Sequence, residues 1–370
     1  MYTEITAISP SEHMRRRPAM YLGSTDKKGF AGMLQNALVD FTELYQTDNF
    51  LCCIEFDKQF VKLELTGQLN TVLTAKALGP ISNKYGYLYI TAMAYLSSRF
   101  EAQLGHTTLV FVNGELVNSP PVFNHNPTAT ISMVFIPDDT IFKGAVLDYE
   151  WLNQTLKQFA MLNRHMQLLI KDCRQPYLNQ SYHYYPNGIA QLFEKTINER
   201  HSGNQFTLQV EHTTANYAYQ LCIGFNRALW KNETLSFANH IHTYAGGSLQ
   251  DGVLQGVIKA LKLYVSRFAG RQYNFTRGIV KQGLTQVLAV RGANLEFAGC
   301  TKAELAVPLI KTEARNLVFN AVLTYLNQHP QHAGNFIAMF DKTVYHQTER
   351  QLTHCTMQCI VAQPNVAVVG

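Results

Sequence analysis

The most informative segment of this chain lies near its N-terminus and reads Glu12-His13-Met14-Arg15-Arg16-Arg17-Pro18-Ala19-Met20-Tyr21-Leu22-Gly23-Ser24-Thr25. Its three consecutive arginines have no apolar core before them, so we do not expect this segment to be a secretory signal. Downstream, the spacing of apolar residues predicts a helix over residues 29–45. The segment therefore leads directly into the first long predicted helix.

Length and composition are typical of a folded intracellular protein. The chain has 370 residues, 46% of them hydrophobic, which favours two domains and excludes disorder as a description of the whole. Only 15% of the residues are charged. No run approaches the roughly 18 apolar residues of a membrane span. Seven cysteines without framework spacing suit a reducing compartment, so we expect a cytoplasmic protein with no membrane contact.

Positive charge is concentrated in the second half of the chain. Residues 1–202 carry 17 Lys and Arg against 18 Asp and Glu, and the remainder carries 14 against 8, which gives the net charge of +5. No acid lies between residues 252 and 295, whereas this span contains the basic residues Lys259, Lys262, Arg267, Arg271, Arg277, Lys281 and Arg291. Interleaved with them are the aromatic residues Tyr264, Phe268, Tyr273 and Phe275.

Such a span predicts a DNA-facing surface, because cations contact phosphates and aromatic rings stack on unpaired bases. The alternative is a basic surface helix whose aromatic residues are buried in the core.

Periodicity predicts helices and strands in both halves of the chain. Helices are expected at residues 29–45, 88–99, 148–170, 188–200, 247–268 and 311–328. Strands are expected at residues 51–56, 60–65, 107–112, 131–136, 206–210, 217–223, 284–290 and near 335–340. The polar run His201-Ser202-Gly203-Asn204 has the composition of a linker. We therefore predict an α+β fold with domains at residues 1–202 and 203–370.

Three colinear motifs resemble those of type II DNA topoisomerases. Residues 12–25 resemble the signature Arg-x-Arg-Pro-x-Met-Tyr-Ile-Gly, which in that family leads into the first helix of the ATPase domain. Phe237-Ala238-Asn239-His240-Ile241 and Gly246-Gly247-Ser248 resemble the Phe-x-Asn-x-Ile and Gly-Gly-Thr-His segments of the DNA gyrase B family. Lys281-Gln282-Gly283-Leu284 and Phe297-Ala298-Gly299-Cys300-Thr301-Lys302 resemble its transducer motifs Arg-Glu-Gly-Leu and Phe-x-x-Gln-Thr-Lys.

This resemblance implies a GHKL-like α/β sandwich over residues 1–202, followed by a ribosomal S5-like transducer domain over residues 203–370. The family's N-terminal arm, which crosses to the partner subunit, corresponds to residues 1–10. The resemblance therefore implies a homodimer, or a heterodimer with a gyrase-type subunit. No Glu-Gly-Asp-Ser or Asp-x-Asp motif occurs, so we expect that this chain does not cleave DNA by itself.

The family's catalytic positions are altered. A Glu general base and a Mg²⁺-ligating Asn lie one helical turn apart in the family, and these positions correspond to Asn36 and Asp40. Asn36 cannot accept a proton from water, whereas Asp40 retains an oxygen ligand for Mg²⁺. The alternative is that both are simply polar residues on a helix face. Leu65 replaces the adenine-reading Asp of the motif Asp-x-Gly-x-Gly, in which Gly67 remains.

Three further elements of the family's nucleotide site are altered as well. Of the family's glycine-rich lid only Gly86 remains, in a stretch that also contains Tyr85, Tyr87 and Tyr89. The family's Thr-Gly-Thr motif is reduced to Thr128-Ala129-Thr130. In the transducer loop, Cys300 replaces Gln, and Lys302 corresponds to the Lys that reaches the γ-phosphate.

We therefore predict a pseudo-ATPase with no catalytic residue and no required cofactor, which acts as a binding or regulatory protein on DNA or on a type II topoisomerase subunit. Its vestigial nucleotide contacts would be Asp40, Gly67, Gly86 and Lys302.

One alternative is a divergent but active ATPase module that binds ATP and Mg²⁺ and supports DNA strand passage. Another is a structural or defence-related dimer with an unrelated partner. No metal site is expected, because Cys355, Cys359 and His354 lack a fourth ligand at standard spacing.

Overall fold

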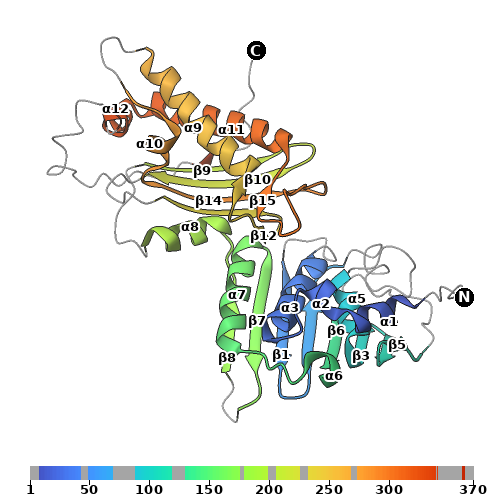
Figure 1. Ribbon diagram of the computed structural model, residues 1–370. Helices are drawn as coiled ribbons and strands as arrows, with labels where there is room; N and C mark the ends of the chain where they lie inside the picture. The colour runs from blue at the N-terminus through green and yellow to red at the C-terminus, as the bar shows by residue number, and fades with distance from the viewer. Residues whose placement is uncertain are drawn as a thin grey trace, which may run out of the picture. The chain divides into compact units, whose positions relative to one another are not determined.

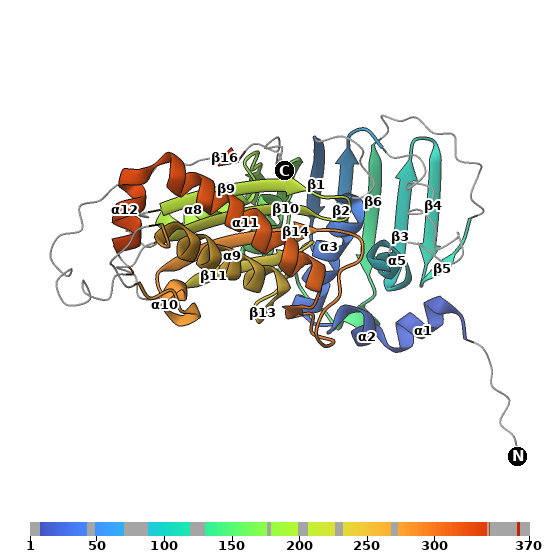
Figure 2. The same cartoon turned by 90° about the horizontal axis from the view of Figure 1, so that it is seen from above.

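The computed structural model describes residues 8–42, 49–69, 88–118, 130–175, 179–198, 206–225, 232–267, 273–338, 340 and 361–362. The chain divides into two units, Met1–Pro186 and Asn187–Gly370, each built on its own sheet (Figures 1 and 2). The linker expected near residue 202 lies outside the described residues. The helix α8 (Ile189–Asn198), which the sequence placed in the first domain, packs against strands of the second unit. The division between the units therefore precedes this helix.

The first unit is built on an eight-stranded sheet with the order β5-β4-β3-β6-β2-β1-β7-β8. Its strands are β1 (Phe50–Phe56), β2 (Val61–Thr66), β3 (Ser97–Leu104), β4 (Thr107–Val112), β5 (Glu115–Leu116), β6 (Ile131–Pro137), β7 (Met166–Asp172) and β8 (Asn179–His183). Its helices are α1 (Pro10–Arg16), α2 (Pro18–Leu22), α3 (Lys27–Thr42), α5 (Leu88–Tyr95), α6 (Asp139–Phe142) and α7 (Tyr149–Leu162). Strands β1 and β7 pair in parallel, and their other partners are antiparallel.

The core of the first unit lies between one face of this sheet and helices α3, α5 and α7 (Figure 1). Buried and more exposed residues alternate along β1, β4, β6 and β7, which is typical of a sheet with one covered face. Phe41 on α3 and Phe159 on α7 belong to the same buried cluster as Ile54 and Phe135 of the sheet. This packing fixes α3 and α5 next to each other.

Three of the predicted elements were wrong. The helix expected at residues 88–99 ends at Tyr95, and β3 begins at Ser97. The helix expected at residues 148–170 ends at Leu162, and residues 166–172 form β7, whose alternating burial is typical of a strand. The strand expected near residues 335–340 is instead part of helix α12 (Pro330–Ala338), in which Ala333, Phe336 and Ile337 share the buried face at helical spacing.

The second unit is built on a six-stranded sheet with the order β12-β11-β14-β10-β9-β16. Its strands are β9 (Phe206–Thr213), β10 (Ala218–Phe225), β11 (Glu233–Ala238), β12 (Ile241–His242), β14 (Leu284–Arg291) and β16 (Val361–Ala362), and the pair β13 (Gly246–Gly247) and β15 (Glu304–Leu305) stands apart. Besides α8 and α12, its helices are α9 (Ser248–Val265), α10 (Arg277–Lys281) and α11 (Pro308–Gln328). Helices α9 and α11 cover one face of the sheet and α8 the other (Figure 1).

Helices α9 and α11 pack closely because two glycines of α9 face α11. A Cβ added at Gly252 would lie 2.5 Å from the carbonyl oxygen of Lys311, and one added at Gly256 would lie 2.7 Å from that of Arg315. Backbone atoms cannot move aside as the end of a flexible side chain can. Gly256→Ala therefore has to push the two helices apart.

We expect Gly256→Ala to lower the free energy of unfolding by about 1–3 kcal/mol, even though alanine is the better helix former. Chemical denaturation measures this change. The matched control is Gly334→Ala in α12, where an added Cβ meets nothing within 4 Å. That control should be neutral or slightly stabilising. Equal effects of the two substitutions would contradict the close packing of α9 on α11.

Candidate functional site

The motifs that carry the topoisomerase resemblance have structural roles in the described residues. Arg15 of α1 donates to the carbonyl oxygens of Tyr95 (2.9 Å) and Ser97 (3.1 Å) and forms an ion pair with Asp138. These contacts hold the N-terminal helices against the end of α5 and the start of α6. In the second unit, Asn239 adopts a positive φ of 53° and exchanges two hydrogen bonds with the backbone of Gly292 (3.0 and 3.1 Å).

Asp40, the predicted Mg²⁺ ligand, caps a helix in this structure. It lies on α3 one turn after the partly buried Asn36, and only 8% of Asp40 is exposed. Its Oδ2 accepts hydrogen bonds from the backbone N–H groups of Tyr89 (2.9 Å) and Ile90 (3.1 Å). These groups belong to the first turn of α5, where backbone donors have no partner within the helix and where the helix dipole favours a negative charge.

The same two properties make a helix N-terminus a binding place for phosphate. The Asp40 carboxylate is an anion that belongs to the chain itself. It therefore takes the place at the N-terminus of α5 that a nucleotide phosphate would otherwise take. The sequence did not predict this contact, because the two amides lie 49 and 50 residues away from Asp40. The pKa of the half-buried Tyr89 hydroxyl is raised by burial and by the charge of Asp40.

Leu65, at the predicted adenine-reading position, is part of the hydrophobic core. Its side chain has no exposed surface, and its register partners are Cys52 on β1 and Ile131 on β6. Leu69, three residues beyond the end of β2, is also buried. Gly67 lies between them and is partly buried. The leucine side chain has no polar atom that could accept a hydrogen bond from the amino group of adenine.

Thr66 and Thr130 lie at the same end of the sheet, one residue beyond the Leu65–Ile131 pair. Their hydroxyl oxygens are 3.2 Å apart. The sequence did not predict this pair, which joins two strands across 64 residues. Of the predicted lid, Tyr85, Gly86 and Tyr87 lie outside the described residues, as do Thr128 and Ala129.

Lys302, the predicted γ-phosphate contact, lies in a loop of the second unit. It is exposed, has a positive φ of 55°, and holds its Nζ 5.9 Å from the centre of the Phe297 ring. Cys300 in the same loop is exposed. Contact with a nucleotide through Lys302 therefore stays a prediction.

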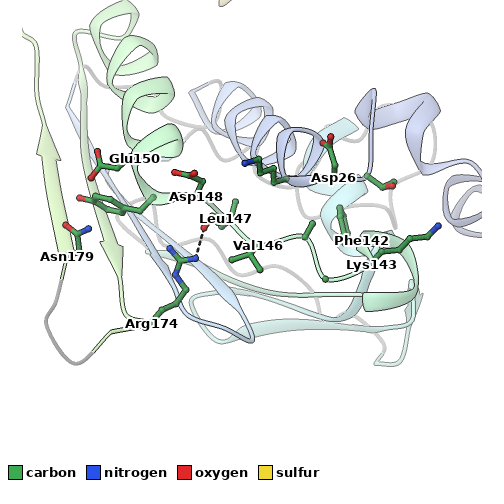
Figure 3. Close-up of a pocket in the computed structure, with 14 residues that line it drawn as sticks. Asp26, Phe142, Lys143, Val146, Leu147, Asp148, Glu150, Arg174 and Asn179 are labelled. Carbon is green, nitrogen blue, oxygen red and sulfur yellow. Dashed lines mark hydrogen bonds between the residues drawn. The ribbon is translucent and has the colours of Figure 1, made fainter.

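A groove with a volume of about 790 Å³ lies beside the end of β7 and the start of β8 (Figure 3). The strand register places it away from Leu65, because Asp172 at the end of β7 pairs with Phe56 whereas Leu65 pairs with Cys52. It is lined by the loop that precedes α7, by the start of α3, and by Arg174 and Asn179. Arg174 donates to the carbonyl oxygen of Leu147 (2.6 Å) and to both carboxylate oxygens of Asp172 (2.6 and 2.8 Å). These hydrogen bonds lower the pKa of Asp172. Of the predicted nucleotide contacts that the structure describes, Asp40, Gly67 and Lys302 do not line this groove.

Most of the predicted DNA-binding cations are exposed on the second unit. Lys259 and Lys262 lie on α9, Arg267 follows this helix, and Arg277 and Lys281 lie on α10. Arg277 pairs with Asp251 (2.5 Å), so its charge is already partly compensated by an acid just before the acid-free span. Arg291 is only partly exposed on β14, and Arg271 lies outside the described residues.

Two of the interleaved aromatic residues are core residues. Tyr264 and Phe275 are each only 6% exposed, and Tyr273 is partly buried with its ring stacked on Phe275. Phe268 lies outside the described residues. The prediction that these rings stack on unpaired bases is therefore wrong for Tyr264 and Phe275, because both side chains are packed on the inward side of the fold.

The described residues offer neither a membrane span nor a metal site. No helix among them is long and apolar enough to cross a membrane. No group of three or more His, Cys, Asp or Glu side chains in these parts of the chain is arranged to hold a metal ion. His354, Cys355 and Cys359 lie outside them.

Comparison with known proteins identifies distant homologues along most of the chain. A family model described as DNA gyrase B matches residues 184–353. The chain is 25% identical to the B subunit of DNA gyrase from Streptococcus pneumoniae and 24% identical to the B subunit of DNA topoisomerase 4 from Enterococcus faecalis, in each case over 90% of this chain. It spans about half of these relatives, 56% and 53% of their lengths.

Solved structures share the fold. The 43K ATPase domain of Thermus thermophilus gyrase B, solved with an aminocoumarin, matches with a TM-score of 0.72 at 19% identity, covering 89% of this chain and 93% of that one. The ATPase region of Saccharomyces cerevisiae topoisomerase II matches with a TM-score of 0.54 at 13% identity, covering 89% and 99%. The predicted α+β fold of a GHKL domain followed by a transducer domain is thereby confirmed.

Proposed function

We propose that this chain, a distant homologue of the ATPase region of DNA gyrase B and topoisomerase IV, is a pseudo-ATPase that acts as a DNA-topology-related binding or regulatory protein. The observation that carries the proposal is the Asp40 carboxylate, which already holds the amides of Tyr89 and Ile90 at the start of α5. A phosphate at those amides would have to displace a nearly buried carboxylate and would be repelled by its charge.

Two further positions support the proposal. Asn36 stands at the position of the general base, and the loss of a general base typically lowers the rate by about 10²–10⁴-fold. Leu65 stands at the adenine-reading position inside the core, so an adenine amino group buried there would lose its partner at a cost of about 1–3 kcal/mol. The three changes affect proton transfer, phosphate binding and base recognition separately.

We expect no binding of a non-hydrolysable ATP analogue with Mg²⁺ at millimolar concentration, and ATP hydrolysis at the background rate. Isothermal titration calorimetry and a phosphate-release assay measure the two quantities. Asn36→Glu alone should not restore turnover, because the phosphate and adenine contacts stay altered. Turnover by the wild type that Asp40→Ala abolishes would instead support the alternative, an active ATPase module of a type II topoisomerase that uses Asp40 to hold Mg²⁺.

We further propose that the second unit binds DNA without sequence preference. Support comes from the five exposed cations at residues 259, 262, 267, 277 and 281, and from the resemblance of this unit to a transducer domain.

We also propose that the chain forms a homodimer or pairs with a gyrase-type subunit. Light scattering of the chain alone, and of its mixture with such a subunit, would test this proposal. A cytoplasmic location is part of the same proposal.

A further inference from the structure

One edge of the first sheet differs from the other sheet edges. In the part of the chain that the structure describes, the two large sheets end in the strands β5, β8, β12 and β16. Three of these edge strands have two residues each, whereas β8 has five and lies beside β7 at the outer edge of its sheet (Figure 1). The register of β8 on β7 runs from Asn179 to His183 without a bulge. The longest of the four edges is therefore also a regular one.

The β8 edge has no charged side chain. Edge strands ordinarily avoid pairing with other chains because they are short, carry charges or contain proline. At the opposite edge of the same sheet, β5 is short and carries Glu115. The five residues of β8 include neither a proline nor a charge, and no Asp, Glu, Lys or Arg occurs between residues 175 and 193. Burial and the nearby Lys157 lower the pKa of His183, so its ring is uncharged at pH 7.

Helix α7 holds β8 from one face of the sheet. The hydroxyl oxygen of Tyr149 lies 2.5 Å from that of Ser181. One turn further along α7, Oδ1 of Asn153 lies 2.6 Å from Nε2 of His183. These contacts fix alternate residues of the strand. A partner that adds to β8 therefore does not have to order it first, which lowers the entropic cost of binding.

The other face of β8 presents an exposed aromatic ring. Tyr182 lies between Ser181 and His183, so its side chain is on the face away from α7. The Tyr182 hydroxyl donates to Oε1 of Gln167 on β7 (2.8 Å), yet 55% of Tyr182 is exposed. Gln180 on the same face is also exposed. This face of the edge strand offers apolar surface that a further strand would cover.

A second copy of the chain fits this edge. A two-fold axis perpendicular to the sheet pairs β8 with β8 in the antiparallel direction and leaves each face of the sheet on its own side. Gln180 and Tyr182 then meet the same side chains of the partner, and so do Ser181 and His183 on the other face. Because neither strand is charged, no like charges are brought together.

We propose that β8 pairs antiparallel with β8 of a second copy, so that the first sheets of the two copies become one continuous sheet. Backbone hydrogen bonds between the two edges hold the copies together, and Tyr182 is covered by the partner strand. The pairing goes beyond the proposed homodimer, because the family resemblance refers to residues 1–10 and not to β8.

The test is the double variant Gln180→Lys with Tyr182→Lys in the full chain. Both positions are exposed on the face away from α7, and lysine is a residue with which natural edge strands block pairing. Sedimentation equilibrium over the micromolar range measures self-association. We expect the dissociation constant of the β8 contact to rise about 10- to 100-fold, because lysines of the two copies oppose each other across the strands.

The matched control is Gln59→Lys with Gln103→Lys, two exposed positions of the same unit outside β8. It changes the net charge equally and should alter the dissociation constant by no more than about twofold, because charges distant from the contact are screened. Thermal melting checks the fold of both variants. If the double variant melts early, Gln180→Lys alone keeps the Tyr182–Gln167 hydrogen bond and should shift the constant in the same direction.

Hydrogen exchange gives a readout that is specific to the strand. In the wild type, exchange of the β8 amides should slow as the protein concentration rises, because the outward N–H groups become paired. The double variant should lose this dependence on concentration, and the control variant should keep it.

Three results would overturn the assignment. A dissociation constant that the β8 variant leaves unchanged would locate self-association elsewhere, and the proposed homodimer would stand. Equal rises in the two double variants would mean that net charge alone is responsible. A wild type that stays monomeric at every concentration would exclude the β8 pairing together with the homodimer, and would leave only the pairing with a gyrase-type subunit.

Discussion

Affinity for duplex DNA is expected to fall about 40- to 500-fold when the salt concentration rises from about 50 to 200 mM, if three to five cations contact phosphates. The reason is that each contact releases a counterion from the DNA, which gives a slope of about −2.7 to −4.5 in log affinity against log salt. Five of the candidate cations are exposed, and Arg277 among them is already paired with Asp251. A titration of a fluorescent duplex at several salt concentrations measures this slope.

Charge reversal identifies the residues responsible. Lys262→Glu with Arg267→Glu should weaken binding of unrelated duplex sequences about equally and make the salt slope shallower by about 2, because phosphate contacts carry no base information. Lys157→Glu with Lys171→Glu in the first unit changes the net charge by the same amount and serves as the control. An affinity that is independent of salt, or reversal variants that bind as tightly as the wild type, would rule out this electrostatic account.

Loss of the Arg15 side chain is expected to lower the free energy of unfolding by about 2–4 kcal/mol. The physical reason is that Asp138, whose side chain is only 9% exposed, would keep its charge without the guanidinium, and two backbone carbonyl groups would lose their donor. Chemical denaturation of Arg15→Ala measures the loss. Arg15→Lys should recover only part of it, because an ammonium cannot reproduce the planar fork of the guanidinium.

The adjacent residue provides the control. Arg16 pairs with Glu12 four residues away, but the two side chains are 64% and 44% exposed, so Arg16→Ala should cost no more than about 0.5 kcal/mol. Similar losses at both positions would contradict a specific role for Arg15.

The pH dependence of stability gives a second readout for Arg15. Burial raises the pKa of Asp138, but hydrogen bonds from Thr140 and Arg15 outweigh it and lower the pKa below the usual value. A carboxylate with a lowered pKa contributes stability above its unfolded pKa, and this contribution is lost as the pH falls through the folded pKa. In Arg15→Ala the pKa of Asp138 should rise, so that the remaining dependence on acid becomes weaker.

Local patterns predicted most of the elements. Two helices were predicted too long where one pattern follows another without a break, and part of helix α12 was predicted as a strand. The strand β1 and the helix α3 follow from alternating and helical spacing of apolar residues. Helix α5 is separated from β3 by a single residue, and α7 is followed by β7 after three, so both helices were predicted too long. At such boundaries, periodicity shows the type of an element more clearly than its end, since the terminal residues satisfy both patterns.

For the candidate site, the sequence predicted the residue types but not their contacts. The residue types at positions 36, 40 and 65 follow from the sequence, and the proposed pseudo-ATPase rests on their correspondence to the family's catalytic and adenine-reading positions. That Asp40 holds the amides of Tyr89 and Ile90, and that Leu65 is fully buried, is visible only in the folded chain.

The sequence by itself therefore determined the α+β fold, the resemblance to the gyrase B ATPase region and the residue types at the predicted nucleotide contacts. The tertiary structure decided which partners these charged side chains contact. Arg15 pairs with Asp138, Asp40 accepts hydrogen bonds at the start of α5, and Arg277 pairs with Asp251. Helical and strand periods are encoded by neighbouring residues, whereas these contacts join residues 123, 49 and 26 positions apart. A hydrogen bond or an ion pair depends on the distance between two atoms in the folded chain, which the local pattern of a sequence does not contain.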